Sequence, residues 1–263
     1  MPNKLPQSFV IIGTGNLAFH LTKSLLKSGL KLKAVAGRSK IDTKKFADFF
    51  KAKFTCDLTD VDSTADIYFL CVPDDQIKNI ASALALKNKL VIHCSGSVNI
   101  EVLKSTSINY GVMYPLYTFS KNDEYLEFDK VPIFIEGSSE QALSKIKKIA
   151  SMLSKKVKPL SSNKRKKLHL AAVLSSNFVN YLLDLTSSYI KKEKVGELND
   201  LIPLIEKTFS KAKIYPPDKV QTGPAARGDS KTIKDHIALL KNYPKHKEVY
   251  TLFSKFILKN SSQ

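Results

Sequence analysis

Six residues near the N-terminus have the types and spacing of a phosphate-binding turn. The segment Gly13-Thr14-Gly15-Asn16-Leu17-Ala18 fits the pattern G-x-G-x-x-A, and it lies between an apolar run, residues 9–12, and a stretch with leucines at helical spacing. In such a turn the first glycine permits a tight bend, the second lets the backbone approach a pyrophosphate, and the third small residue lets the helix pack on the strand. The helix N-terminus then offers free N–H groups to an anion. A purely structural turn is the alternative, but the flanking strand and helix patterns favour dinucleotide binding.

Arg38 and Ser39 indicate which nicotinamide cofactor the turn would hold. They follow the second predicted strand, residues 30–36. In an NAD-specific domain, an Asp or Glu about 20 residues past the glycines accepts hydrogen bonds from the ribose 2′-OH. Here an arginine followed by a serine instead offers a cation and a hydroxyl to a 2′-phosphate, which favours NADP(H). The alternative is that Arg38 is an exposed loop cation.

A long helical pattern in the second half carries one polar stripe. Between residues 168 and 190 the only charged side chain is Asp184, and at about 100° per residue five polar residues fall within one wedge of roughly 100°. These are His169, Ser176, Asn177, Asn180 and Asp184. We expect a helix covered by protein on most sides, whose polar stripe lines a substrate cleft, pairs across a dimer interface, or forms a hydrogen-bonded core network.

A glycine-rich loop, residues 221–229, contains the sequence QTGPAARGD. Gly223 and Gly228 give it backbone freedom, and the guanidinium of Arg227 is suited to a carboxylate or a phosphate. The alternative is that Arg227 and Asp229 pair with each other and cap the following helix.

The charge balance points away from nucleic acid. The 263-residue chain has 42 Lys and Arg against 24 Asp and Glu, a net charge of +18, but Arg38, Arg165 and Arg227 are its only arginines. Base readout and bidentate phosphate binding favour arginine. We therefore expect a solvated lysine-rich surface and no nucleic-acid partner. The run Lys164-Arg165-Lys166-Lys167 could contact an acidic partner, but a charge run at a helix start is usually solvated.

The cysteines and the hydropathy pattern predict a cytoplasmic protein. Cys56, Cys71 and Cys94 are odd in number and lack C-x-x-C spacing, which favours reduced thiols over a disulfide framework or a zinc site, and no metal is expected. The residues before the first strand show no apolar leader, so export is not expected. A membrane span is not expected either, because the polar groups of residues 168–190 would be costly in hydrocarbon.

Strand and helix patterns alternate up to about residue 160, and only helices follow. Strands are predicted at 9–12, 30–36, 53–55, 65–72, 90–93, 110–114, 131–136 and 156–160, and later helices at 162–193, 197–212, 230–242 and 245–259. Asp74 and Asp75 are expected to cap a helix over 76–86. The alternation predicts an α/β fold: a Rossmann-like, doubly wound, mostly parallel sheet in residues 1–160, then a helical domain in 161–263. Ligands bind at the carboxyl ends of such strands, where the glycine turn, Arg38, Val72-Pro73 and Cys94-Ser95 would meet.

Seven segments in order resemble one bacterial protein family: GTGNLA, AGRS, VPDDQI, HCSGS, GVMYPLYTFS, LHLAAVLSSNF and QTGPAARGD. They are similar to a family assigned as NADP oxidoreductases, in which a Rossmann-like domain precedes a helical domain of unknown function. The chain is more distantly similar to deazaflavin-dependent NADP reductases, pyrroline-5-carboxylate reductases, ketopantoate reductases and 6-phosphogluconate dehydrogenases. In these relatives the helical domain usually dimerises, and the active site lies between the two domains.

The resemblance and the strand-end positions together imply a set of site residues. Those expected to bind NADP(H) are Gly13, Thr14, Gly15, Asn16, Leu17, Ala18, Arg38, Ser39, Val72, Pro73, Cys94, Ser95 and Gly96. Those expected to contact substrate are Ser97, Tyr114, Thr222 and Arg227. Many members of the family have His where Tyr114 stands and Gln where Tyr117 stands, and residues 168–190 contain no lysine to match the Lys–Asn pair of the hydroxyacid dehydrogenases.

The function that these observations predict is hydride transfer between NADP(H) and a small carbonyl or imine compound in a cleft between domains of a homodimer. His169 is the candidate general acid, because imidazole titrates near neutral pH, and Asn177 is expected to orient a substrate oxygen. The alternative is a non-catalytic NADP-binding regulatory or scaffold protein whose helical domain dimerises, since the sequence shows no familiar catalytic lysine set.

Overall fold

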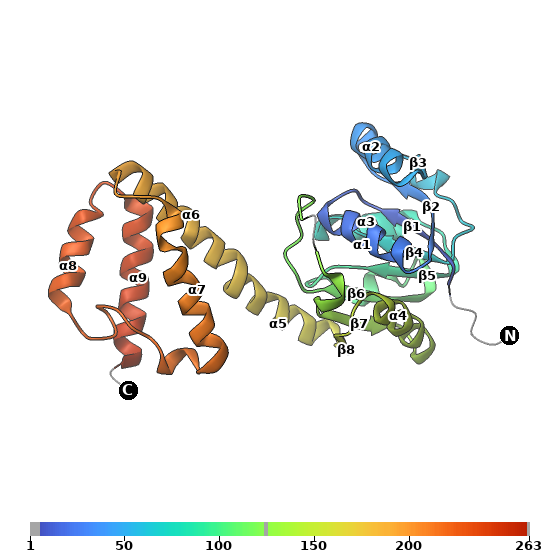
Figure 1. Ribbon diagram of the computed structural model, residues 1–263. Coiled ribbons are helices and arrows are strands. Elements are labelled where there is room, and N and C mark those ends of the chain that lie inside the picture. The colour runs from blue at the N-terminus through green and yellow to red at the C-terminus, as the bar shows by residue number, and fades with distance from the viewer. Residues whose placement is uncertain (1–5, 124–125, 262–263) are drawn as a thin grey trace. The chain divides into compact units, whose positions relative to one another are not determined.

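The computed structural model describes residues 6–123 and 126–261 (Figure 1). The described residues divide into two compact units between Leu174 and Ser175; the part up to Leu174 is called unit 1 and the part from Ser175 is called unit 2. Residues 1–5, on which the expectation about a leader rests, lie outside the described part. The predicted domain boundary at residues 160–161 stays a prediction.

Unit 1 is built on one eight-stranded sheet with the order β3-β2-β1-β4-β5-β6-β7-β8. Its strands are β1 (Ser8–Ile12), β2 (Lys31–Ala36), β3 (Lys53–Thr55), β4 (Ile67–Leu70), β5 (Lys87–His93), β6 (Ser107–Pro115), β7 (Ile133–Gly137) and β8 (Val157–Pro159). All neighbouring strands are parallel except β6 and β7. The predicted Rossmann-like, doubly wound, mostly parallel sheet is therefore confirmed.

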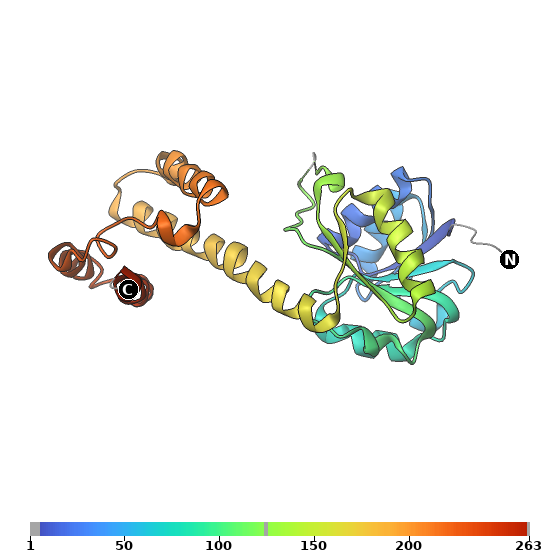
Figure 2. The same ribbon diagram turned by 90° about the horizontal axis from the view of Figure 1, so that it is seen from below.

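Helices cover both faces of this sheet (Figures 1 and 2). Successive side chains of a strand point to opposite faces, so Phe9 and Ile11 of β1 belong to one core layer and Val10 and Ile12 to the other. The first layer also receives buried side chains from α1 (Asn16–Lys27), α2 (Lys40–Phe50) and α4 (Glu140–Leu153), and the second from α3 (Asp74–Ala83). Each large side chain buried in this way stabilises the fold by roughly 1.5–3 kcal/mol. Both faces of the central strands are thus occupied, which leaves the strand ends as the place for a ligand.

Three short 3-10 helices lie in the connections of unit 1, at Leu58–Asp60, Ile100–Leu103 and Phe128–Lys130. Its last helix is α5 (Ser162–Ala172).

Unit 2 consists of helices in the described part of the chain: α6 (Phe178–Glu193), α7 (Leu198–Ile214), α8 (Ser230–Leu239) and α9 (Pro244–Ser261), with a 3-10 turn at Pro217–Lys219. The QTGPAARGD loop lies between that turn and α8. Asp229 caps α8, because its carboxylate accepts from the Thr232 N–H at 3.0 Å. The predicted helical second half is confirmed.

Two local predictions are wrong. The helix predicted over 162–193 is not one α-helix, because a π-helical segment, Val173–Asn177, interrupts it, and an arrangement of side chains computed at 100° per residue does not hold through such a turn. Asp74 and Asp75 do not cap α3 from outside. The N-cap is Pro73, and both acids lie in the first helical turn, where their negative charges interact favourably with the positive end of the helix dipole.

The expectation of a helix covered on most sides by protein is also wrong for the single chain. In α5, the π-helical segment and α6, the only buried residues are Arg165, Leu185 and Ile190. No helix in the described part of the chain is long and apolar enough to cross a membrane.

Candidate active site

The turn after β1 can be formed only by the glycine at its first position. Gly13 has a φ of 112°, and its N–H donates to the Ala36 carbonyl at 2.8 Å. A Cβ at this position would lie 2.2 Å from the Cys71 carbonyl oxygen, so a side chain is excluded both by conformation and by space. At Gly15, the N-cap of α1, a Cβ would meet no described atom within 4 Å. Open space therefore lies in front of the first N–H groups of α1, where an anion binds favourably.

A cavity of about 490 Å³ opens beside this turn, at the carboxyl ends of three adjacent strands. The residues that line it are Ile12, Gly13, Thr14, Gly15, Gly37, Arg38, Ser39, Asp42, Cys56, Leu58, Cys71, Val72, Pro73, Gln76 and Ile80. Seven residues of the predicted cofactor site thus surround one cavity. Asp42, Cys56, Cys71 and Gln76 also line it and were not predicted. Position alone could have indicated Cys71, because it precedes the predicted Val72-Pro73.

This cavity fits an NADP molecule by its donors. Arg38 is exposed at the cavity and supplies a guanidinium, and Ser39 supplies a hydroxyl whose oxygen accepts from the Asp42 N–H at 3.3 Å. Gly37 brings this loop close to α2, since a Cβ there would lie 2.4 Å from Thr43 Oγ1. The cation and the hydroxyl after β2 are suited to bind a 2′-phosphate. The free N–H groups at the start of α1, one strand away, are suited to bind a diphosphate.

Other predicted cofactor residues lie outside this cavity. The amide of Asn16 donates to the Phe119 carbonyl at 2.9 Å, Leu17 packs against the core, and Ala18 is buried. Cys94 is buried, and Ser95 Oγ accepts from the N–H groups of Ser97 and Val98 at 3.0 Å each. Ser95 therefore stabilises the turn after β5.

A second group of side chains gathers at the ends of β5 and β6. The hydroxyl of Tyr114 lies 3.0 Å from Nδ1 of His169 on α5, and the two rings meet edge to face with centroids 5.9 Å apart. Gly96 lies against both rings, because a Cβ on it would be 2.7 Å from His169 Nδ1 and 2.8 Å from Tyr114 Cζ. The structure thus brings together three predicted site residues, Gly96, Tyr114 and His169, from distant parts of the sequence. Position 96 is glycine because a side chain there would collide with both rings.

The environment of Tyr114 keeps its hydroxyl protonated. Burial raises the pKa of Tyr114 above its ordinary value, and the negative charge of Asp74 raises it further, whereas the positive charge of Arg165 opposes these effects. The carboxylate of Asp74 also accepts a short hydrogen bond from the Ser97 hydroxyl. Tyr114 is therefore a hydrogen-bond donor to His169 whenever Nδ1 is unprotonated.

Arg165 is the strongest departure from the sequence prediction. It was expected on a solvated surface with its lysine neighbours, but it is 0% exposed. Its guanidinium donates to Glu136 Oε2 at 2.5 Å, to the Val98 carbonyl at 2.6 Å and to Ser162 Oγ at 3.1 Å. A buried charge needs such partners. Because residues four apart share a face of a helix, this anchor also fixes His169 one turn further along α5.

His93, at the end of β5, is a buried neutral imidazole. Its Nδ1 accepts from the Ser95 N–H at 3.2 Å, and burial, followed by the charge of Arg165, lowers the pKa of His93 to about 3. The predictions did not single it out, because a histidine ending a strand reads equally well as a core residue.

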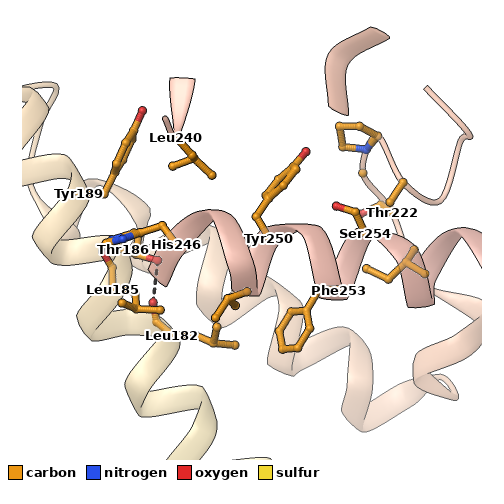
Figure 3. Close-up of a pocket in the computed structure, with 15 residues that line it drawn as sticks. Leu182, Leu185, Thr186, Tyr189, Thr222, Leu240, His246, Tyr250, Phe253 and Ser254 are labelled. Atoms are coloured by element: carbon orange, nitrogen blue, oxygen red, sulfur yellow. Dashed lines mark hydrogen bonds between the residues drawn. The ribbon is translucent and has the colours of Figure 1, made fainter. Parts of the chain in front are cut away.

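Unit 2 has its own pocket, of about 410 Å³, whose walls are mainly apolar (Figure 3). Figure 3 shows Leu182, Leu185, Thr186 and Tyr189 from α6 facing His246, Tyr250, Phe253 and Ser254 from α9. Thr222 lines this pocket with Gly223, Pro224 and Ala225, whereas Arg227 and Asn177 are not among its lining residues. His246 Nε2 lies 2.9 Å from the Leu185 carbonyl. Of the predicted site residues in unit 2, the pocket therefore includes Thr222 alone.

The doubly wound sheet and the cavity at its strand ends define a Rossmann-type nucleotide-binding protein. Two family models match the chain: "NADP oxidoreductase coenzyme F420-dependent" over residues 8–96 and "Domain of unknown function (DUF2520)" over residues 131–257. The chain belongs to the NADP oxidoreductase family that combines these two domains, and its cofactor is NADP.

Solved structures agree with this assignment. A protein from Bacteroides fragilis named "putative NADP oxidoreductase" is 34% identical, with a TM-score of 0.90 over 97% of this chain and 98% of that one. A protein from Thermotoga maritima is 26% identical, with a TM-score of 0.78 over 97% of this chain and 100% of that one. A reductive aminase from Aspergillus terreus, in complex with NADPH and ethyl levulinate, shares the fold at 13% identity, with a TM-score of 0.73 over 97% and 93% of the two chains. No curated protein matches this chain.

Proposed function

We propose that this NADP oxidoreductase reduces a small carbonyl or imine compound, with His169 as the proton donor. The observation that carries the proposal is the Tyr114–His169 pair held against Gly96, in the turn that follows β5. An imidazole next to the strand ends of a nucleotide-binding sheet is suited to supply a proton where a hydride is transferred. The reductive aminase of similar fold, solved in complex with NADPH and ethyl levulinate, is consistent with this class of substrate.

The chain's own residues then have separate roles. Arg38 and Ser39 bind the 2′-phosphate, the N-terminus of α1 with Gly13, Thr14 and Gly15 binds the diphosphate, and Val72-Pro73 packs against the dinucleotide. Bound NADPH supplies the hydride chemistry. Residues 94–96 form the adjoining wall, and Ser97, held by Asp74, offers a hydroxyl to the substrate.

Proton delivery falls to the imidazole of His169. When its Nδ1 accepts from Tyr114, the proton of the neutral ring is on Nε2, so Tyr114 fixes both the ring orientation and the tautomer. We further propose that Asn177, Thr222 and Arg227 of unit 2 contact substrate, with the Arg227 guanidinium binding an anionic group.

Purified protein tests this proposal directly. Calorimetry first measures the dissociation constants of NADPH and NADH, and loss of NADPH absorbance is then followed with a panel of cyclic imines and keto acids. His169→Asn should lower turnover by about 10²–10⁴-fold, as expected for loss of a general acid, while the NADPH dissociation constant changes only a few-fold. Unchanged turnover would show that another group moves the proton. Tight NADPH binding with no turnover on any compound would favour the regulatory alternative.

We also propose a homodimer formed through unit 2. Twelve large apolar side chains of this unit are exposed in the described single chain: Phe178, Tyr181, Val195, Ile202, Leu204, Phe209, Ile214, Tyr215, Leu239, Leu252, Phe253 and Phe256. α7 has no buried residue over its 17 residues. Exposed apolar surface on this scale marks an interface. Light scattering should give twice the chain mass, and Leu204→Glu with Phe209→Glu should give the monomer; a monomeric wild-type protein would refute the proposal.

The free thiols Cys56, Cys71 and Cys94 are typical of a reducing compartment, and we propose the cytoplasm as the location.

A further inference from the structure

Cys71 and Cys94 form a close pair of free thiols to which the proposed function assigns no chemical step. Each directly follows a strand, β4 and β5 respectively, and these strands pair in parallel up to Leu70 and His93. The two cysteines are therefore opposite each other, one position beyond the last pair. Their sulfur atoms lie 3.8 Å apart, within hydrogen-bonding distance for two thiols.

The backbone at this position suits a disulfide. Neighbouring strands lie about 4.8 Å apart, which is within the roughly 4.4–6.8 Å between Cα atoms that disulfides span. The separation of the strands therefore meets the first requirement for a bond between the two sulfurs, which would lie about 2.05 Å apart.

The two thiols differ in access. Cys71 is half-buried and lines the 490 Å³ cavity, whereas Cys94 is 6% exposed. The contact with the Cys71 thiol, together with burial, raises the pKa of Cys94. A small oxidant that enters the cavity thus meets Cys71 first, and Cys94 lies behind it at the distance of a resolving thiol.

We propose that Cys71 and Cys94 are a site of intramolecular disulfide formation, entered by a peroxide or similar small oxidant through the nucleotide cavity. The Cys71 sulfur attacks one peroxide oxygen, the O–O bond breaks, and Cys71 sulfenic acid and one water result. The Cys94 sulfur then attacks the Cys71 sulfur, the S–O bond breaks, and the hydroxyl leaves as a second water with the Cys94 proton. In total, two thiols and one peroxide give one disulfide and two waters, with two electrons passing from sulfur to oxygen.

The cross-link would join the base of the glycine turn to the next strand. The Cys71 N–H donates to the Ile12 carbonyl at 2.8 Å, and the Cys71 carbonyl is the atom against which Gly13 packs. A dinucleotide in the cavity would cover the Cys71 thiol, a consequence that rests on the proposed function. The cross-link should therefore form more slowly in the nucleotide-bound protein.

The test uses the full chain carrying Cys56→Ser, which removes the exposed third thiol. After treatment with hydrogen peroxide and alkylation of the remaining thiols, mass spectrometry should find the Cys71 and Cys94 peptides joined, with two hydrogens lost and the link reversed by dithiothreitol. Adding Cys94→Ser should stop the reaction at Cys71 sulfenic acid, which dimedone traps, and adding Cys71→Ser should leave Cys94 unmodified. Two unlinked thiols after oxidation, or links only between chains, would overturn the proposal.

A second arm tests entry through the cavity. With NADP⁺ at about 100 times its dissociation constant, only about one hundredth of the protein is nucleotide-free, so the rate of cross-linking should fall by up to ~100-fold. Arg38→Asp should remove most of this protection at the same NADP⁺ concentration. An unchanged rate in protein that calorimetry shows to be saturated would refute entry through the cavity. If NADP⁺ gives no binding heat, the proposed function fails, while the cross-link itself is judged by the first arm.

Discussion

Replacing Arg165 by Met should destabilise unit 1 far more than any other substitution in the same lysine-rich run. Methionine keeps a side chain of similar length but removes the guanidinium, which is 0% exposed and holds Glu136, the Val98 carbonyl and Ser162 at 2.5–3.1 Å. The change would leave the Glu136 carboxylate without its cation and the Val98 carbonyl without its donor.

The expected size follows from how buried the two partners are. Removing one member of a buried ion pair destabilises a protein by about 3–5 kcal/mol, because the other charge is left uncompensated. The Glu136 side chain keeps 19% of its surface in water and still accepts from the N–H and hydroxyl of Ser162, so the lower end, about 3 kcal/mol, applies. For a unit of this size, about 2–4 °C per kcal/mol converts this loss into a fall in Tm of roughly 6–12 °C.

Scanning calorimetry of the full chain measures this effect, with Lys166→Met as the matched control. Lys166 is exposed on the same helix, and its replacement should change stability by no more than about 0.5 kcal/mol. Adding Glu136→Gln to Arg165→Met should recover part of the loss, because it removes the unpaired charge. Equal Tm values for Arg165→Met and Lys166→Met would refute the buried anchor.

Four further results are expected. Arg38→Asp should weaken NADPH binding much more than NADH binding in calorimetry, because the 2′-phosphate loses its cation, and equal losses would remove Arg38 from that role. Gly15→Ala should leave the free energy of unfolding within about 0.5 kcal/mol of wild type yet weaken NADPH binding at least about tenfold, since its Cβ would point into open space that the diphosphate needs. Gly96→Ala should instead displace the His169 and Tyr114 rings, which NMR would detect as shifted His169 ring signals. The pKa of His93 is lowered to about 3 from an ordinary 6.5. Between these two pH values the folded state therefore binds fewer protons than the unfolded state. Stability should therefore fall by about 2 kcal/mol from pH 7.5 to pH 5, and urea titrations should show this fall reduced in His93→Gln.

Local sequence rules were sufficient for the scaffold and for the cofactor cavity. The glycine turn is fixed by its own φ angle and by one close approach, and strand ends of a parallel sheet necessarily meet at one edge, so Gly13, Arg38 and Val72 could be placed together before any coordinates. The cavity residues that this reasoning missed lie between the motifs in the sequence. Cys71 and Asp42 line the same cavity because the sheet and the start of α2 carry them there.

The second group of side chains depends on contacts that no local pattern contains. Tyr114 and His169 are 55 residues apart, and Arg165 reaches Glu136 across 29 residues. A lysine-rich run at a helix start predicts a solvated face, and the partner carboxylate on β7 decides otherwise. The one local signal was Gly96, a glycine between two serines at a strand end, where the absent side chain is what lets two rings approach.

The helices of unit 2 show a second limit of prediction from hydrophobic periodicity. A period of 3.6 residues tells which positions of α7 are apolar, and the helix forms as predicted, but the period says nothing of what will cover those positions. In the single chain Ile202, Leu204 and Phe209 remain exposed. A helical unit with so little buried apolar surface lacks the main stabilising contribution that offsets the entropy of ordering it. In the dimer that we propose, a second copy would cover this surface and supply that contribution. The exposed apolar side chains, which one sequence could not explain, are thus the physical reason for the proposal.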